Sequence, residues 1–133
     1  MIGPSNTRVF LCTHDTDMRK SFDSLRGVIR SAMHLDPLAP GYLFVFKNKR
    51  GDRIKCVFWD HDGFAMFYKV LQRGTFKFPS LENINSAGLE IDPSTLRMIL
   101  DGIDLASIHR HQRYRRSSTY SPVTDISQLN AGI

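Results

Sequence analysis

The strongest constraint on the fold is the segment from Tyr42 to Trp59, in which two apolar stretches flank a short basic turn. The stretches YLFVFK and RIKCVFW are rich in β-branched and aromatic residues, and the intervening NKRGD contains a glycine suited to a tight turn. This pattern predicts an antiparallel β-hairpin. A third strand is expected in FAMFYKVLQRG, with a helix as the alternative, and Asp62-Gly63 is expected to form the turn before it.

Two other segments have the spacing of amphipathic helices. In HDTDMRKSFDSLRGVIRSAMH, apolar residues recur every three or four positions, at Met18, Phe22, Leu25, Ile29 and Met33. We expect Asp15 or Thr16 to cap this helix. The second segment is IDPSTLRMILDGI, where Asp92 precedes a proline at the first helical position.

Short strands are also expected at RVFLCT and GLEI, and Gly74 is expected to turn the chain into TFKFP. These elements predict an α+β fold, with an antiparallel β meander of four to five strands and two helices packed on one face. Residues 1–106 are expected to form a single domain. Residues 107–133 lack apolar periodicity and are expected to be a basic tail, flexible unless a partner orders it.

The charge of the chain is concentrated locally. The formal net charge of the 133 residues is +5, but four arginines and one acidic residue follow Ala106, so residues 1–106 hold fourteen basic and twelve acidic residues. No apolar run approaches the ~18 residues that span a membrane, and the N-terminus lacks the pattern of a signal peptide. We therefore expect a cytoplasmic protein without a membrane partner. Cys12 and Cys56 lie in apolar runs and are expected to be small buried hydrophobic residues.

Basic residues interleaved with aromatic ones indicate a surface that contacts nucleic acid. Because strand faces alternate, one sheet face is expected to carry Arg53, Lys55, Lys69 and Arg73, with Trp59 and Phe67 between them. Cations neutralise phosphates and aromatic rings stack on bases. A solvated outer sheet face and a contact with another protein are the alternative explanations. The full candidate set is Arg19, Lys20, Arg26, Arg30, Lys47, Lys49, Arg50, Arg53, Lys55, Trp59, Lys69 and Arg73.

Catalytic patterns are weak in this sequence. Asp60, His61 and Asp62 could hold a metal ion together with Asp15 or Asp17, but neighbouring strand residues point to opposite faces and Asp-Gly favours a turn for its own reasons. The segment His109-Arg110-His111 with Tyr114 has the residue types of a single-strand nuclease without the buried strand that such a site needs. No GxSxG, Walker-type or dinucleotide glycine motif occurs. No catalytic residue, metal site or cofactor is predicted.

Five motifs, in this order and spacing, resemble a known family. They are TDMRK-x-FD-x-L from Thr16, LFVF-x-x-x-RGD-x-IK from Leu43, WD-x-DG from Trp59, YK-x-L-x-x-G-x-F-x-x-P from Tyr68 and L-x-GID from Leu100. The chain from Arg8 to Asp104 resembles the accessory protein of the IS-sixty-six family of bacterial insertion sequences, often labelled TnpB and unrelated to the RNA-guided nuclease of that label. Ser21 and Ser24 stand where the family often has glycine, and Phe78 where it often has tryptophan.

The resemblance implies a role in transposition beside a larger transposase that holds the catalytic acids. We therefore expect a non-enzymatic accessory factor that binds the DNA of transposon ends, or the complex of DNA with the transposase. A protein-only adaptor is the first alternative, and it would need an exposed apolar patch such as Phe44, Phe46 and Tyr68. A metal-dependent nuclease using Asp15, Asp17, Asp60 and Asp62 is the second. The sequence leaves the oligomeric state open.

Overall fold

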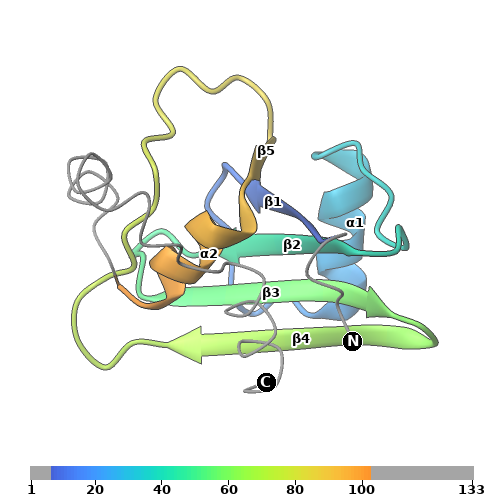
Figure 1. The fold of residues 1–133 in the computed structure, drawn as a ribbon, viewed down its shortest axis with the longest axis horizontal. Helices are drawn as coiled ribbons and strands as arrows, with labels where there is room; N and C mark the ends of the chain where they lie inside the picture. Colours follow the sequence, from blue (N-terminus) through green and yellow to red (C-terminus); the bar gives the residue numbers. More distant parts are fainter. Residues whose placement is uncertain (1–6, 103–133) are drawn as a thin grey trace, which may run out of the picture.

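The computed structural model describes residues 7–102 as a five-stranded sheet with two helices (Figure 1). The α+β class is therefore confirmed. The strands are β1 (Arg8–Cys12), β2 (Tyr42–Lys47), β3 (Arg53–Asp60), β4 (Gly63–Val70) and β5 (Gly88–Ile91), and the helices are α1 (Phe22–Ser31) and α2 (Pro93–Leu100). Their order across the sheet is β4-β3-β2-β1-β5. The third strand is thus confirmed as β4, and GLEI as β5.

The sheet is mostly antiparallel but contains one parallel pair. β2, β3 and β4 form the predicted meander, with Val45 opposite Cys56 and Cys56 opposite Phe67. β5 is antiparallel to β1, whereas β1 runs parallel to β2, with Phe10 opposite Phe44. A meander through all the strands is therefore wrong. The segment between β1 and β2 contains α1, and a crossover of this kind returns the chain in its original direction.

The helices cover opposite faces of the sheet, so the prediction that both pack on one face is wrong. α1 packs through Leu25 and Ile29 on the face that carries Phe10. α2 packs through Leu96 and Ile99 on the face that carries Val9. The physical reason is visible in β2, where Leu43 to Phe46 are four consecutive buried residues. A strand that is apolar on both faces needs cover on both.

Helix α1 begins later than the sequence pattern predicts. Ser21 is its N-cap residue, and neither Asp15 nor Thr16 caps it. Residues 15–20 instead form an irregular segment, here called the strap. A hydrogen bond from the Thr16 N–H to the Lys47 carbonyl, 2.8 Å long, holds the strap against the end of β2. Helix α2 begins as predicted, with Asp92 as its N-cap residue and a proline in its first turn.

The turn before β3 is confirmed, and the turn after β3 differs in detail from the prediction. In the β2–β3 turn, Gly51 has φ +77°. In the β3–β4 turn, Asp60 pairs with Gly63 and the residue with positive φ is His61, at 66°. The expected Asp62-Gly63 turn is therefore displaced by one residue. Gly74 has φ +73°, and the TFKFP segment that follows it crosses the β2–β3 turn, where the Phe76 N–H donates to the Gly51 carbonyl at 2.8 Å.

Among residues 7–102, neither helix is long and apolar enough to cross a membrane. The predicted boundary between residues 106 and 107 lies outside the described residues. The same holds for the basic tail and for His109, His111 and Tyr114.

Candidate nucleic-acid interface

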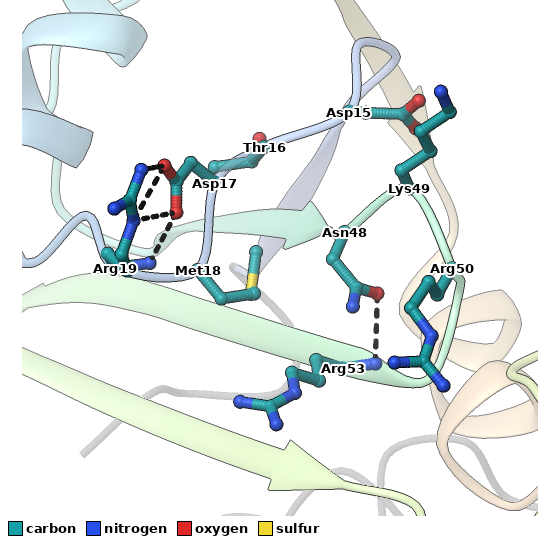
Figure 2. A pocket seen from close by; sticks show the side chains of 9 residues that line it. All are labelled: Asp15, Thr16, Asp17, Met18, Arg19, Asn48, Lys49, Arg50 and Arg53. Atoms are coloured by element: carbon teal, nitrogen blue, oxygen red, sulfur yellow. Dashed lines mark hydrogen bonds and ion pairs between the residues drawn. The ribbon is translucent and has the colours of Figure 1, made fainter.

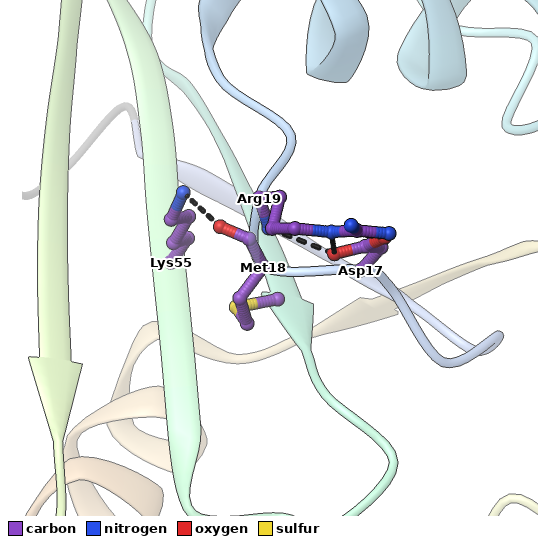
Figure 3. A network of polar contacts seen from close by, with 4 residues as sticks. All are labelled: Asp17, Met18, Arg19 and Lys55. Atoms are coloured by element: carbon purple, nitrogen blue, oxygen red, sulfur yellow. Dashed lines mark hydrogen bonds and ion pairs between the residues drawn. The ribbon is translucent and has the colours of Figure 1, made fainter.

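Lys55, on β3, is buried and holds the strap against the sheet. Only 6% of this residue is exposed. Its Nζ donates to the carbonyl oxygens of Met18 and Lys20, each at 2.7 Å, and lies 4.7 Å from the centroid of the Tyr68 ring. Figure 3 shows the bond to Met18. A buried ammonium group requires such partners. The expectation that Lys55 faces solvent is therefore wrong.

The strap presents its own charged side chains outward. The Asp17 carboxylate accepts a bond from the Arg19 N–H at 2.9 Å and pairs with the Arg19 guanidinium, Nη2 to Oδ2 at 2.6 Å (Figure 3). These bonds lower the pKa of Asp17 to about 2, so that its carboxylate is charged throughout the neutral range. The Arg19 side chain remains 92% exposed. Lys47 makes a similar pair with Asp15, Nζ to Oδ1 at 2.7 Å.

The predicted basic sheet face does not exist, because its residues are divided between the two faces. Lys69 lies opposite Ile54, and directly paired residues of an antiparallel ladder share a face. Lys69 is therefore on the α2 face, where its Nζ donates to the Leu100 carbonyl at 3.1 Å. Lys55 and Arg53 are on the α1 face. Alternation along a sequence predicts which residues of one strand share a face. It does not predict the register between two strands, and the register determined which face carries Lys69.

An open depression of about 510 Å³ lies between the strap and the β2–β3 turn (Figure 2). Four of its lining residues are cationic. Arg19 comes from the strap, Lys49 and Arg50 from the turn, and Arg53 from the start of β3. The other lining residues are Asp15, Thr16, Asp17, Met18 and Asn48. Asn48 shapes the turn, since its Oδ1 accepts from the Arg53 N–H at 3.1 Å and its Nδ2 donates to Asp52 at 2.7 Å.

Two further cations come from the segment that follows β4. The Leu71 N–H donates to the Asp52 carbonyl at 2.8 Å, and the Phe76 N–H to the Gly51 carbonyl. These two bonds hold the segment against the β2–β3 turn and place the exposed Arg73 and Lys77 beside it. Lys77 was missed in the sequence analysis. The sequence signal that could have identified Lys77 is its place next to the aromatic residue Phe76, which is buried in the structure.

Together these residues lie at one end of the sheet, around the β2–β3 turn, and are here called the basic end. It comprises Arg19, Lys20, Lys47, Lys49, Arg50, Arg53, Arg73 and Lys77, with three carboxylates, Asp15, Asp17 and Asp52. The remaining residues of 7–102 hold six cations and eight carboxylates. The positive excess of the described part of the chain is therefore concentrated at this end. Within residues 7–102, no ion pair involves Lys20, Lys49, Arg53, Arg73 or Lys77.

Other candidates lie outside the basic end. Arg26, on α1, pairs with Asp23 at 2.8 Å and lies over the Phe64 ring, 5.6 Å from its centroid. Trp59 packs edge-on against the same ring, with centroids 5.2 Å apart. Phe64 stands near the start of β4, at the opposite end of the hairpin from Arg53. Arg30 is exposed on α1.

The carboxylates of the suggested metal site do not converge. Asp15 and Asp17 line the depression with Arg53, the first residue of β3, whereas Asp60 is the last residue of that strand. At ~3.3 Å per residue the two ends of β3 lie roughly 23 Å apart. In the part of the chain that the structure describes, no three His, Cys, Asp or Glu side chains form a group that could hold a metal ion.

Comparison with known proteins decides the family. The model of the family described as IS66 Orf2 like protein matches residues 7–110, most of the chain. The chain belongs to this family. Membership supports an accessory role in the transposition of insertion sequences and confirms the resemblance found in the sequence. The match covers every residue of the basic end.

Two relatives come from Sinorhizobium fredii (strain NBRC 101917 / NGR234), and both are named only as uncharacterized proteins. The protein y4jC is 33% identical over 111 residues, which cover 83% of this chain and 92% of the relative. The protein y4hO is 39% identical over 99 residues, which cover 74% of this chain and 83% of the relative. No solved structure matches this chain.

Proposed function

We propose that this chain acts in transposition as a non-catalytic factor that binds DNA through the basic end. The observation that carries the proposal is the segregation of charge, with eight cations and three carboxylates at one end of the sheet in a chain whose other described residues are slightly acidic. Such a concentration of positive charge attracts a polyanion by neutralising phosphates and releasing counterions. The transposase of the same element is the expected second partner.

The geometry of the depression suits a phosphate backbone. Its cations come from the strap, the turn and β3, so they surround an open space on several sides (Figure 2). The exposed fractions of the Arg19 and Arg50 side chains are 92% and 84%, so a ligand can reach them, although the Nε and Nη2 of Arg19 already donate to Asp17. Arginine binds phosphate through two parallel N–H donors, which adds orientation to attraction.

The protein-only adaptor has less support. Phe44 and Phe46, two of the three residues suggested for its apolar patch, are fully buried. Those two assignments are wrong, because β2 is covered on both faces. Tyr68 is 42% exposed. Of the three residues suggested for the patch, only Tyr68 is exposed, so the patch does not form as suggested.

The test is fluorescence anisotropy of the full chain with a duplex carrying the terminal sequence of its own element, across a salt series. We expect the double variant Lys49→Glu/Arg50→Glu to bind at least about tenfold more weakly, and its salt slope to fall by about two, because two phosphate contacts are lost. A scrambled duplex shows whether sequence is read as well as phosphate.

The matched control is Arg26→Glu/Arg30→Glu, which makes the same change in net charge on α1, outside the basic end. We expect its affinity to fall by much less. Equal losses in both double variants would mean that bulk charge governs binding and would contradict the assignment to the basic end. Circular dichroism must show that both variants remain folded.

A further inference from the structure

Among residues 7–102, β4 is an edge strand with few of the usual protections. It has eight residues, GFAMFYKV, and its one charged side chain, Lys69, donates to the Leu100 carbonyl. Tyr68 and Val70 are 42% and 40% exposed. The other edge strand, β5, has only four residues, and its Glu90 is paired with Arg8. Long apolar edge strands tend to pair with another strand, and proteins normally shorten or charge them.

The hydrogen-bonding direction of β4 follows from its register. The bond from the Leu71 N–H to the Asp52 carbonyl continues the β3–β4 ladder by one residue. In an antiparallel ladder every second residue bonds to the same neighbour. Residues 63, 65, 67 and 69 therefore bond to β3. The N–H and C=O groups of Phe64, Met66, Tyr68 and Val70 point away from it, toward the edge that no strand of the described residues covers.

We propose that β4 pairs antiparallel with β4 of a second copy of this chain, so that two sheets join into one of ten strands. The register that engages all four outward-pointing residues has its two-fold axis at Phe67 and forms about eight new backbone hydrogen bonds. Phe67 then lies opposite its own copy. This proposal stands independently of DNA binding.

Side chains in this register are complementary. Phe64 lies opposite Val70 of the other copy, and Met66 opposite Tyr68. All four are on the α1 face, because their partners on β3 are the odd-numbered residues 53 to 59. The pairing would cover the exposed Tyr68 and Val70 with apolar neighbours. Cross-strand pairs of aromatic and aliphatic side chains stabilise such a ladder.

The charges at the two ends of β4 favour a second copy of this chain as the partner that pairs with this strand. The β3–β4 turn at one end carries Asp60 and Asp62, both exposed, and the segment after the other end carries the exposed Arg73. Antiparallel self-pairing brings the acidic turn of each copy beside Arg73 of the other. A parallel arrangement would place like charges together, which disfavours it.

The first test is the mass of the full chain in solution, measured by light scattering after size exclusion over a concentration series. We expect twice the 15.2 kDa of one chain. Val70→Pro removes an outward N–H from each copy without removing a bond to β3, so it should raise the dissociation constant at least about tenfold. The control is Leu38→Ser, which removes an equally exposed apolar side chain away from β4.

The second test exchanges the charges at the two ends. Asp60→Lys/Asp62→Lys and Arg73→Glu should each weaken the dimer in low salt. An equimolar mixture of the two variants should form a heterodimer of wild-type strength, because both contacts then join opposite charges. Each variant places its changes on the surface, so circular dichroism should show an unchanged fold.

Three outcomes would overturn the proposal. The first is a monomer whose β4 amides exchange hydrogen freely, which would mean that β4 does not pair with a second copy and is available to a different protein. The second is a monomer whose β4 amides resist hydrogen exchange, since residues outside 7–102 would then cover the edge. The third is a dimer that Val70→Pro does not weaken, which would place the contact elsewhere. None of these measurements involves DNA, so their failure is distinguishable from failure of the proposed function.

Discussion

At the scale of single residues, Lys55 shows why charge in a sequence does not identify a binding surface. Its ammonium group binds two backbone carbonyls and an aromatic ring instead of solvent. The Met18 and Lys20 carbonyls accept bonds from Lys55, and both residues lie before the start of α1 at Phe22. The burial of Lys55 thus removes one cation from the expected basic face, and the register that places Lys69 on the α2 face removes another.

Removing this side chain should destabilise the domain. We expect Lys55→Ala to lower the free energy of unfolding by about 3 kcal/mol, because two short bonds from a charged donor at a partly buried site are lost. The control is Lys69→Ala, which loses one longer bond at a half-buried site and should cost about 1 kcal/mol. Urea denaturation measures both. Equal losses would contradict the anchoring role of Lys55.

The cysteines behave as the sequence predicts. Cys12 and Cys56 are both free and buried, in agreement with their place in apolar strands. Burial raises the pKa of the Cys56 thiol to about 12. A thiol of this kind is protonated at neutral pH, and only the thiolate is reactive. These residues contribute to the core.

At the scale of elements, the β2–β3 turn of the basic end requires a glycine, whereas helix α1 does not. Gly51 has φ +77° in the β2–β3 turn, whereas Gly27 lies inside α1 with open space where a Cβ would stand. A Cβ atom destabilises the left-handed conformation of Gly51, whereas replacing the glycine within α1 by alanine stabilises the helix. The turn that carries Lys49 and Arg50 therefore depends on its glycine.

We expect the same substitution to have opposite effects at these positions. Gly51→Ala should lower the free energy of unfolding by about 1 kcal/mol or more, because the turn must hold a residue in the left-handed region. Gly27→Ala should raise it by about 0.5–1 kcal/mol. Thermal and urea unfolding of both variants measure the difference. A neutral Gly51→Ala would mean that the turn can adopt another conformation.

At the scale of the whole molecule, the two proposals are linked by the sheet. The two-fold axis of the paired strands is perpendicular to the sheet, so both α1 faces lie on the same side. Arg53 of the two copies would be separated by six residues along β4 and three strand spacings across, roughly 25 Å. Both basic ends could then contact one DNA duplex.

This arrangement predicts avidity. Val70→Pro should weaken binding to a duplex of about 20 base pairs by about tenfold, although it removes no cation, because the second basic end is no longer linked to the first. Anisotropy at protein concentrations where the wild type is dimeric measures the effect, with Leu38→Ser as the control. Equal affinities of the wild type and Val70→Pro would show that the two ends bind independently.

The sequence by itself determined the α+β class, the β2–β3–β4 meander, the second helix with its cap, and the family. Each of these rests on local periodicity, turn chemistry or motif spacing, which a single segment carries. Only the tertiary structure decided the side of each helix, the parallel pairing of β1 with β2, and which cations are exposed. Those features depend on strand register and on contacts such as that of Lys55 with the strap, which join residues distant in the chain.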